Sequence, residues 1–413
     1  GHPHVTLAQV IPGGTTADPF RTLSRWTAAG RGQVTPVSFA ASDGAQLNGY
    51  VFTPPRSVPA PAGGYPGVVI TTGSIQGYQQ LYFWAAEGLA EAGYMVLTYD
   101  VQGQGNSDTL PASCQPSQAQ LSQGNVCTGV PYQQNYNFFQ GTEDALDFFF
   151  STPSNPYPNA KYLAAASPVS AVGQQLSAYN PGYSQLNASE VGIAGHSLGA
   201  SAVSQVGQCD ARVKAIVAWD NLAPATSCAA GQPVAVRTPA LGINSEYFFN
   251  PTPMSSAPDP HARDSAFTQL SSAGVDTMQI ALRSSMHLEY SYVPYILPAS
   301  SLGERVAFYY SLAWFDYYLR GDQGAFARLV ASQFDTSSDT HAIGAGYYSP
   351  QAAAADPTDP AAGNVPYKIA GLPVADRFSF YYESEYSLTA PGGTKTSCSD
   401  MRAGCPASPP PTP

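Results

Sequence analysis

The sequence predicts an α/β fold, with a mostly parallel central sheet and helices on both of its faces. Short apolar runs at Gly67–Thr72, Tyr94–Asp100 and Val213–Trp219 indicate strands that are buried on both sides. Segments with helical spacing of apolar residues alternate with these runs, at Tyr82–Ala92 and Leu198–Gln208. Alternation of buried strands with helices is typical of a parallel sheet that helices cover.

Local signals predict the remaining elements. Asp43-Gly44 lies between two apolar runs and is a strong turn signal, so a β-hairpin is expected there. Its strands are Val34–Ala41 and Gln46–Thr53. Apolar runs and helical spacing also predict strands at Ala240–Asn244 and Thr277–Leu282, a strand-like run at Arg377–Tyr382, and helices at Glu143–Ser151 and Leu302–Arg320.

Four parts are expected along the chain. They are an irregular N-terminal segment at 1–33, a main α/β domain at 34–322, an extension packed on the core at 323–395, and a flexible proline-rich tail at 396–413. Two loop insertions, at 108–137 and 152–188, interrupt the main domain. Long loops inside a compact fold are usually functional, for example as lids or binding walls.

Composition excludes some partners. Only 11% of the residues are charged, and the net charge is −11 with 17 Lys and Arg in 413 residues. Nucleic-acid binding needs clustered basic residues, so it is not expected. Gly103-x-Gly105 follows Asp100, but the full dinucleotide fingerprint and the P-loop lysine are both missing there. A structural turn is predicted at this place, and no cofactor.

The cysteines indicate an oxidising compartment. No apolar run reaches the ~18 residues of a transmembrane helix, and the chain is expected to start after a removed signal peptide. Six cysteines fall in three local pairs, without the spacing of a zinc site. Disulfides and secretion are therefore predicted, with the nearest-neighbour pairs Cys114/Cys127, Cys209/Cys228 and Cys398/Cys405.

The most informative stretch is Glu190–Ser201. It predicts a short buried strand, a sharp turn at Ser197 and the start of a helix. Its centre, Gly195-His196-Ser197-Leu198-Gly199, fits the pattern G-x-S-x-G. In a nucleophile elbow the serine hydroxyl stands clear of the sheet, and the flanking glycines let strand and helix backbones nearly touch.

A serine hydroxyl becomes a nucleophile only when a base takes its proton and a carboxylate orients that base. Of the six histidines, His287 directly follows the strand at 277–282 and is the expected base, whereas His196 should point away from the serine. Two acids are candidates, because Asp220 and Glu246 both follow strands. Asp220 is favoured, and a Cys209–Cys228 bridge would hold its loop in place.

A tetrahedral intermediate needs two backbone N–H donors for its oxyanion. The expected donors are Leu198, just after the nucleophile, and Ser74, in the loop after the first parallel strand. No metal site is expected, since Asp356 and Asp359 lie in a proline-rich loop. Aromatic residues near the predicted site suggest an apolar cleft, the alternative being core positions: Trp219, Tyr247, Phe248, Tyr290 and Tyr292.

From Val34 to Asp322 the chain resembles the α/β-hydrolase superfamily. The resemblance rests on the Asp43-Gly44 hairpin, Thr72-Gly73-Ser74, the elbow around Ser197, His287, and the helix segment Trp314–Gly321. It implies the α/β-hydrolase fold, a catalytic domain at 34–322, and triad residues in the order serine, acid, histidine.

Within the superfamily two groups are similar to this chain, and they imply different acids. The run Ile243–Phe248 resembles the plasma-type platelet-activating-factor acetylhydrolases, which imply Asp220. The secreted bacterial cutinase-like and polyester hydrolases imply Glu246. Both insertions and the C-terminal extension depart from these groups.

The expected function is therefore that of a secreted serine esterase or lipase-like enzyme, which cleaves carboxylic esters with an apolar acyl or aromatic group. The alternatives are a phospholipid deacylase, a polyester hydrolase, a peptidase or a non-catalytic binding module. The sequence leaves the natural substrate, the role of the insertions as a lid and the oligomeric state open.

Overall fold

The computed structural model describes residues 23–74, 77–109, 135–160, 176–228, 231–247, 263–291 and 301–330, and then 346–348, 364–366, 368–369, 372–373, 381–401 and 405. Several predicted features lie outside these residues: Cys114, Cys127, Phe248, Tyr292, Asp356, Asp359, most of the first insertion, residues 161–175 of the second insertion, residues 377–380 and most of the proline-rich tail. The side chains of Glu246 and Tyr247 also lie outside the description, although their backbone belongs to a strand.

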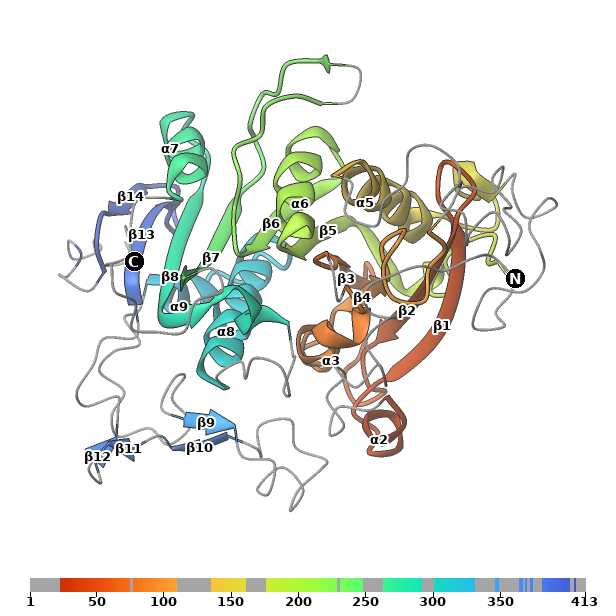
Figure 1. The fold of residues 1–413 in the computed structure, drawn as a ribbon, viewed down its shortest axis with the longest axis horizontal. Coiled ribbons are helices and arrows are strands. Elements are labelled where there is room, and N and C mark those ends of the chain that lie inside the picture. Colours follow the sequence, from red (N-terminus) through yellow and green to blue (C-terminus); the bar gives the residue numbers. More distant parts are fainter. Residues whose placement is uncertain are drawn as a thin grey trace, which may run out of the picture.

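A ten-stranded sheet runs through the molecule in the order β1-β2-β4-β3-β5-β6-β7-β8-β13-β14 (Figure 1). The strands from β4 to β8 in this order pair in parallel. Antiparallel strands complete the sheet at both edges. The strands are β1 (Gln33–Ala40), β2 (Gln46–Thr53), β3 (Tyr65–Thr71), β4 (Met95–Tyr99), β5 (Leu186–His196), β6 (Val213–Trp219), β7 (Ala240–Tyr247), β8 (Thr277–Met286), β13 (Tyr381–Thr389) and β14 (Lys395–Cys398).

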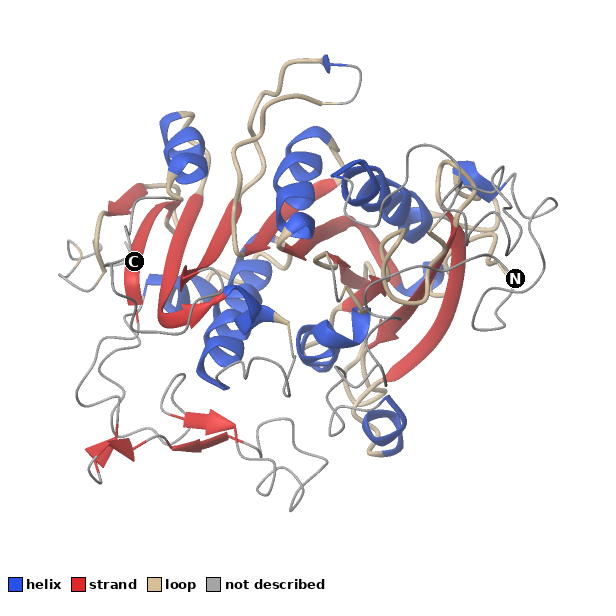
Figure 2. Ribbon diagram, viewed as in Figure 1, coloured by secondary structure: helices blue, strands red, loops and turns tan. Residues whose placement is uncertain are grey.

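Helices cover both faces of this sheet, as Figure 2 shows. One apolar core joins the sheet to α3 (Phe83–Glu91), α8 (Ser301–Tyr318) and α9 (Ala325–Val330). The opposite core joins it to α5 (Asn135–Phe150), α6 (Leu198–Cys209) and α7 (Ser265–Ser272). The expectation of an α/β fold with a mostly parallel, doubly covered sheet is confirmed.

The remaining elements are short. They are α2 (Leu23–Ala28), the 3₁₀ helices η1 (Gln79–Tyr82), η3 (Tyr183–Gln185) and η5 (His287–Tyr290), and two small two-stranded sheets formed by β9 (Gly346–Tyr348) with β10 (Asn364–Pro366) and by β11 (Lys368–Ile369) with β12 (Leu372–Pro373). Within the expected irregular segment at 1–33, residues 23–28 form helix α2, and residues 1–22 lie outside the described part. Trp26 of this helix is buried against Phe52, with ring centroids 5.7 Å apart.

The predicted hairpin is present, with Ala40 opposite Gln46. Gly44 has a φ of 84°, a conformation that glycine adopts without strain. Asp43 closes the turn, because its carboxylate accepts the N–H of Ala45 at 3.0 Å. The turn residue types at 43 and 44 therefore explain the register of β1 and β2.

One helix starts earlier than predicted, and another agrees with its prediction. Helix α5 begins at Asn135, eight residues before the expected Glu143, so it takes up the end of the predicted first insertion. Its first turn contains two asparagines, and Asn137 is buried and donates to the carbonyl of Gln102. Helix α8 lies within two residues of its predicted bounds, and its Trp314 and Phe315 are fully buried in the core that it shares with the sheet.

The glycine-rich turn after β4 wraps around a buried carboxylate. Asp100 accepts backbone N–H groups from Gln79 at 2.7 Å and Asn106 at 2.9 Å. Gly105 has a φ of 50°, and a Cβ there would lie 2.3 Å from the Asp100 carboxyl carbon. Burial raises the pKa of Asp100 to about 7 against the lowering effect of these hydrogen bonds. These contacts agree with the structural turn that the sequence predicts.

Candidate active site

The stretch around Ser197 forms a sharp turn between strand and helix. β5 ends at His196 and α6 begins at Leu198, so Ser197 alone makes the turn. Its φ of 58° and ψ of −121° lie in a region that residues with a side chain rarely adopt. Such strain persists only where the surrounding structure enforces it, and it is common at functional sites.

Small residues are required on both sides of this turn. A Cβ on Gly195 would lie 2.4 Å from the carbonyl oxygen of Gly199. A Cβ on Gly199 would lie 2.4 Å from the carbonyl oxygens of Thr71 and Thr72, at the end of β3. Backbone atoms cannot move away as flexible side chains can, so both positions exclude any side chain.

We expect Gly195→Ala to lower the free energy of unfolding by about 3 kcal/mol or more, because the added methyl group overlaps backbone. Chemical denaturation with urea measures this loss. Gly141→Ala in α5 is the matched control, since its Cβ would meet only ordinary contacts at 3.6 Å or more. That variant should be neutral or more stable by up to about 1 kcal/mol, because alanine favours helix. Equal effects of the two variants would contradict the steric argument.

Three side chains from separate strands meet at the turn. The hydroxyl of Ser197 donates to Nε2 of His287 at 2.8 Å. Nδ1 of His287 donates to Oδ2 of Asp220 at 2.6 Å. Ser197 follows β5, Asp220 follows β6 and His287 follows β8, at the carboxyl ends of parallel strands. The structure thus brings together the predicted nucleophile, base and favoured acid.

Asp220 is buried, with a side-chain exposure of 1%, and it has partners besides His287. Oδ1 accepts the Ser245 N–H at 3.1 Å, and Oδ2 accepts the Ser245 hydroxyl at 2.5 Å. The guanidinium of Arg263 forms an ion pair with Oδ1. Burial alone would raise the pKa of Asp220, but the hydrogen bond from His287, the charge of Arg263 and the Ser245 hydroxyl hold this pKa below its usual value. Asp220 is therefore ionised at neutral pH.

Glu246, the alternative acid, belongs to β7 and follows Ser245 directly. Ser245 itself donates its hydroxyl to Asp220. The contact with His287 is made by Asp220, which agrees with the order of preference that the sequence analysis gives.

His196 is buried beside Ser197, and its ring does not occupy the position of the His287 ring. Its Nδ1 lies 2.8 Å from the hydroxyl of Tyr82, and its Nε2 lies 2.7 Å from the carbonyl oxygen of His287. The Tyr82 oxygen also accepts the N–H of Gly73 at 3.0 Å. Burial first, and then the neighbouring His287, lower the pKa of His196 to about 3, so this imidazole is neutral at neutral pH.

One expected oxyanion donor, Leu198, follows Ser197 in the chain, and the other, Ser74, belongs to a loop that passes close to Ser197. Leu198 is the first residue of α6, and N–H groups in the first turn of a helix have no carbonyl partner within the helix. Ser74 follows Gly73, whose Cβ, if present, would lie 3.1 Å from the Cβ of Ser197. Leu198, Ser74 and Ser197 are partly exposed, whereas Asp220 and His287 are buried. The partly exposed residues of the cluster therefore include Ser197 and both residues that carry the candidate N–H donors.

The expected aromatic cleft is corrected for two residues. Trp219 is fully buried and its indole donates to the Ser311 hydroxyl at 3.1 Å. Tyr290 is also fully buried, in the same core. Both are core residues, and because they are fully buried they offer no surface to a ligand. The other expected cleft residues, Tyr247, Phe248 and Tyr292, fall outside the described side chains.

Two of the predicted disulfides are present, Cys209–Cys228 and Cys398–Cys405. The first joins the last residue of α6 to the loop that follows β6, and this loop begins at Asp220. It therefore connects the helix behind Ser197 to the segment that carries the acid. Among the helices within the described ranges, none is both long and apolar enough to cross a bilayer.

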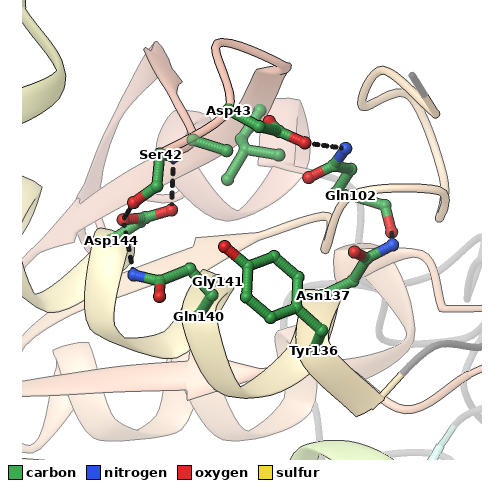
Figure 3. Close-up of a pocket in the computed structure, with 10 residues that line it drawn as sticks. Ser42, Asp43, Gln102, Tyr136, Asn137, Gln140, Gly141 and Asp144 are labelled. Carbon is green, nitrogen blue, oxygen red and sulfur yellow. Dashed lines mark hydrogen bonds between the residues drawn. The ribbon is translucent and has the colours of Figure 1, made fainter. Parts of the chain in front are cut away.

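A separate small hollow lies between the β1–β2 turn, Gln102 and α5 (Figure 3). Its polar side chains bind one another. Asp144 accepts the N–H and hydroxyl of Ser42 at 2.7 and 2.5 Å, and Asp43 accepts the amide of Gln102 at 2.8 Å. The bonds of Ser42 join the hairpin turn to α5, and the bond of Asp43 joins it to the turn after β4. The described contacts of the hollow are therefore structural.

Sequence reasoning missed four residues of the site's surroundings: Tyr82, His196 as a hydrogen-bonding group, Ser245 and Arg263. None of them has a local pattern, since each is defined by a partner from another strand or helix. Comparison of the chain with protein-family models and with curated proteins finds no match in either. The geometry of the site is therefore the basis for a proposed function.

Proposed function

We propose that this chain is a secreted serine hydrolase of the α/β-hydrolase fold that cleaves carboxylic esters through an acyl-enzyme. The observation that carries the proposal is the continuous hydrogen-bonded series from Ser197 to His287 to Asp220, at 2.8 and 2.6 Å. The strained turn at Ser197, the strand order and the chain order of serine, acid and histidine support it further. Two disulfides fit an oxidising compartment.

In the first step Ser197 Oγ attacks the ester carbonyl carbon while its proton passes to Nε2 of His287. The resulting imidazolium is stabilised by the buried carboxylate of Asp220, which Ser245 and Arg263 keep ionised. Leu198 and Ser74 donate backbone N–H groups to the oxyanion. The tetrahedral intermediate then expels the alcohol, which takes the proton from His287, and leaves the acyl group on Ser197.

The second half of the reaction repeats these roles with water. His287 takes a proton from water, the hydroxide equivalent attacks the acyl carbonyl, and collapse of the second intermediate releases the carboxylic acid. Ser197 regains its proton from His287. Water is the co-reactant that these steps consume besides the ester, and His287 takes up and returns the proton in each half of the reaction.

Hydrolysis of p-nitrophenyl esters from C2 to C16, together with labelling by a fluorophosphonate, tests the proposal. We expect release of p-nitrophenol and a single covalent adduct on Ser197, located by peptide mass spectrometry. Ser201→Ala is a suitable control, because Ser201 lies one turn further along α6. The control should keep both activities.

The same assay distinguishes the alternatives. The chain-length profile separates an esterase from a lipase, and parallel assays with phospholipid, polyester and peptide amides test the deacylase, polymer and peptidase alternatives. A wild type that neither hydrolyses any of these substrates nor reacts with the fluorophosphonate would contradict the proposal and favour a binding module.

A further inference from the structure

One buried imidazole contacts both of the segments that must stay fixed around Ser197. His196 bonds through Nε2 to the backbone carbonyl of His287, the residue that begins η5 after β8. Through Nδ1 it bonds to the hydroxyl of Tyr82, which in turn accepts the N–H of Gly73 in the loop after β3. The loop of the candidate donor Ser74 and the backbone of the candidate base are thus tied to the same ring.

The direction of each hydrogen bond follows from the chemistry of the groups. A carbonyl oxygen only accepts, so Nε2 of His196 carries the hydrogen that it donates to His287. The ring is neutral, so its Nδ1 has no hydrogen and accepts from the Tyr82 hydroxyl. Tyr82 uses its remaining oxygen lone pair for the Gly73 N–H. The series therefore runs in one direction, and both ring nitrogens of His196 and the hydroxyl of Tyr82 take part in it.

We propose that Tyr82 and His196 are positioning residues, which hold two parts of the site in place around Ser197. These parts are the loop with Gly73 and the candidate oxyanion donor Ser74, and the proton acceptor His287. This inference rests on the proposed ester hydrolysis. The hydrogen-bonded path from His196 to Gly73 runs through Tyr82, and His196 bonds to the main-chain carbonyl of His287, so neither positioning residue needs to touch the reacting atoms. Misplacement by about 1 Å can cost roughly 100-fold in rate.

A neutral ring is suited to this place. The ring centroids of His196 and His287 lie 4.8 Å apart, and His287 becomes positively charged during each proton transfer. A charged group at position 196 would oppose that transfer, whereas a neutral imidazole can hold the His287 carbonyl without repelling its ring. The stacking of Tyr82 on Trp219, with planes 7° apart, fixes the hydroxyl that completes the series.

The test uses Tyr82→Phe and His196→Phe, singly and together, with kcat expressed per active site titrated by fluorophosphonate. We expect each single variant to lower kcat by about 10- to 100-fold with little change in KM. The double variant should lose no more than the worse single variant, because the two residues act in one series. His196→Gln, whose amide can donate to the His287 carbonyl, should recover part of the loss.

Tyr94→Phe is the matched control. Tyr94 is an equally buried tyrosine, but its hydroxyl donates to Asp316 at 2.7 Å, at the opposite end of β4 from the site. Its loss should lower thermal stability and leave kcat per titrated site unchanged. If Tyr82→Phe and His196→Phe also leave kcat unchanged, or lose activity only with the folded fraction, the positioning role is overturned.

A second readout does not depend on turnover. ¹⁵N NMR of histidine-labelled protein, assigned with His196→Gln, should show His196 as the neutral Nε2–H form between about pH 5 and pH 8, and Tyr82→Phe should disturb this signal. A His196 that titrates like an exposed histidine would overturn the inference. A wild type that hydrolyses no ester but shows His196 in the neutral Nε2–H form would contradict ester hydrolysis and would support the hydrogen-bonded series.

Discussion

Replacement of Ser197 by alanine is expected to lower kcat for p-nitrophenyl ester hydrolysis by roughly 10⁵- to 10⁶-fold. The variant loses only the hydroxyl group that donates to Nε2 of His287, and the oxygen of this group is the proposed attacking atom. The methyl group of alanine keeps the packing of the turn and retains its φ of 58°. Steady-state kinetics with saturating ester, on enzyme freed of wild-type contamination, measures the change.

Thermal unfolding of the same variant separates chemistry from folding. Ser197→Ala should unfold within about 5 °C of the wild-type temperature, because it loses one partly buried hydrogen bond and no packing. Ser197→Gly should be still more stable relative to alanine, since glycine adopts a positive φ without strain. A Ser197→Ala variant that retains more than about one percent of wild-type turnover would exclude Ser197 as the nucleophile.

The second large effect is expected for Asp220→Asn, which should lower kcat by roughly 10⁴-fold. The asparagine amide cannot hold His287 with a hydrogen on Nδ1 and cannot stabilise the imidazolium. Glu246→Gln is the matched comparison, since it neutralises the alternative acid, which belongs to β7. Because Asp220 makes the 2.6 Å bond to His287, Glu246→Gln should remain within about tenfold of wild type. Kinetics of both variants at several pH values measures the difference.

The reverse order of the two effects would assign the acid to Glu246. The ion pair with Arg263 allows a further distinction between them. Asp220→Asn leaves that guanidinium without its carboxylate, but 28% of the Arg263 side chain is exposed and can be hydrated. A large loss of activity with a modest loss of thermal stability is therefore the expected signature of Asp220.

Elements with strong local patterns were predictable. The buried strands β3, β4 and β6 and the helix α6 lie within a few residues of their predicted bounds, because each is a compact apolar run between turn signals. Pairing between distant segments was not predictable in this way. β13 lies against β8, about a hundred residues earlier in the chain, and no local signal specifies that partner. β8 itself continues to Met286, past the predicted end at Leu282.

The same division holds at the site. Ser197 and His287 follow from the elbow motif and from the position of a histidine after a strand, and the structure places them in contact. Asp220 could only be ranked above Glu246, because both follow strands and a distance is needed to separate them. Arg263 and Tyr82 could not be found, since their roles come from three-dimensional neighbours that have no fixed spacing in the chain.

The antiparallel strands at the two margins of the sheet have a consequence for self-association. A margin with free N–H and C=O groups can pair with another molecule and start aggregation. Here β1 carries the exposed Pro36, which has no N–H to offer. At the other margin β14 is four residues long and includes the exposed Lys395. β13 and β14 also cover β8, so the strand that leads to His287 is shielded from intermolecular pairing.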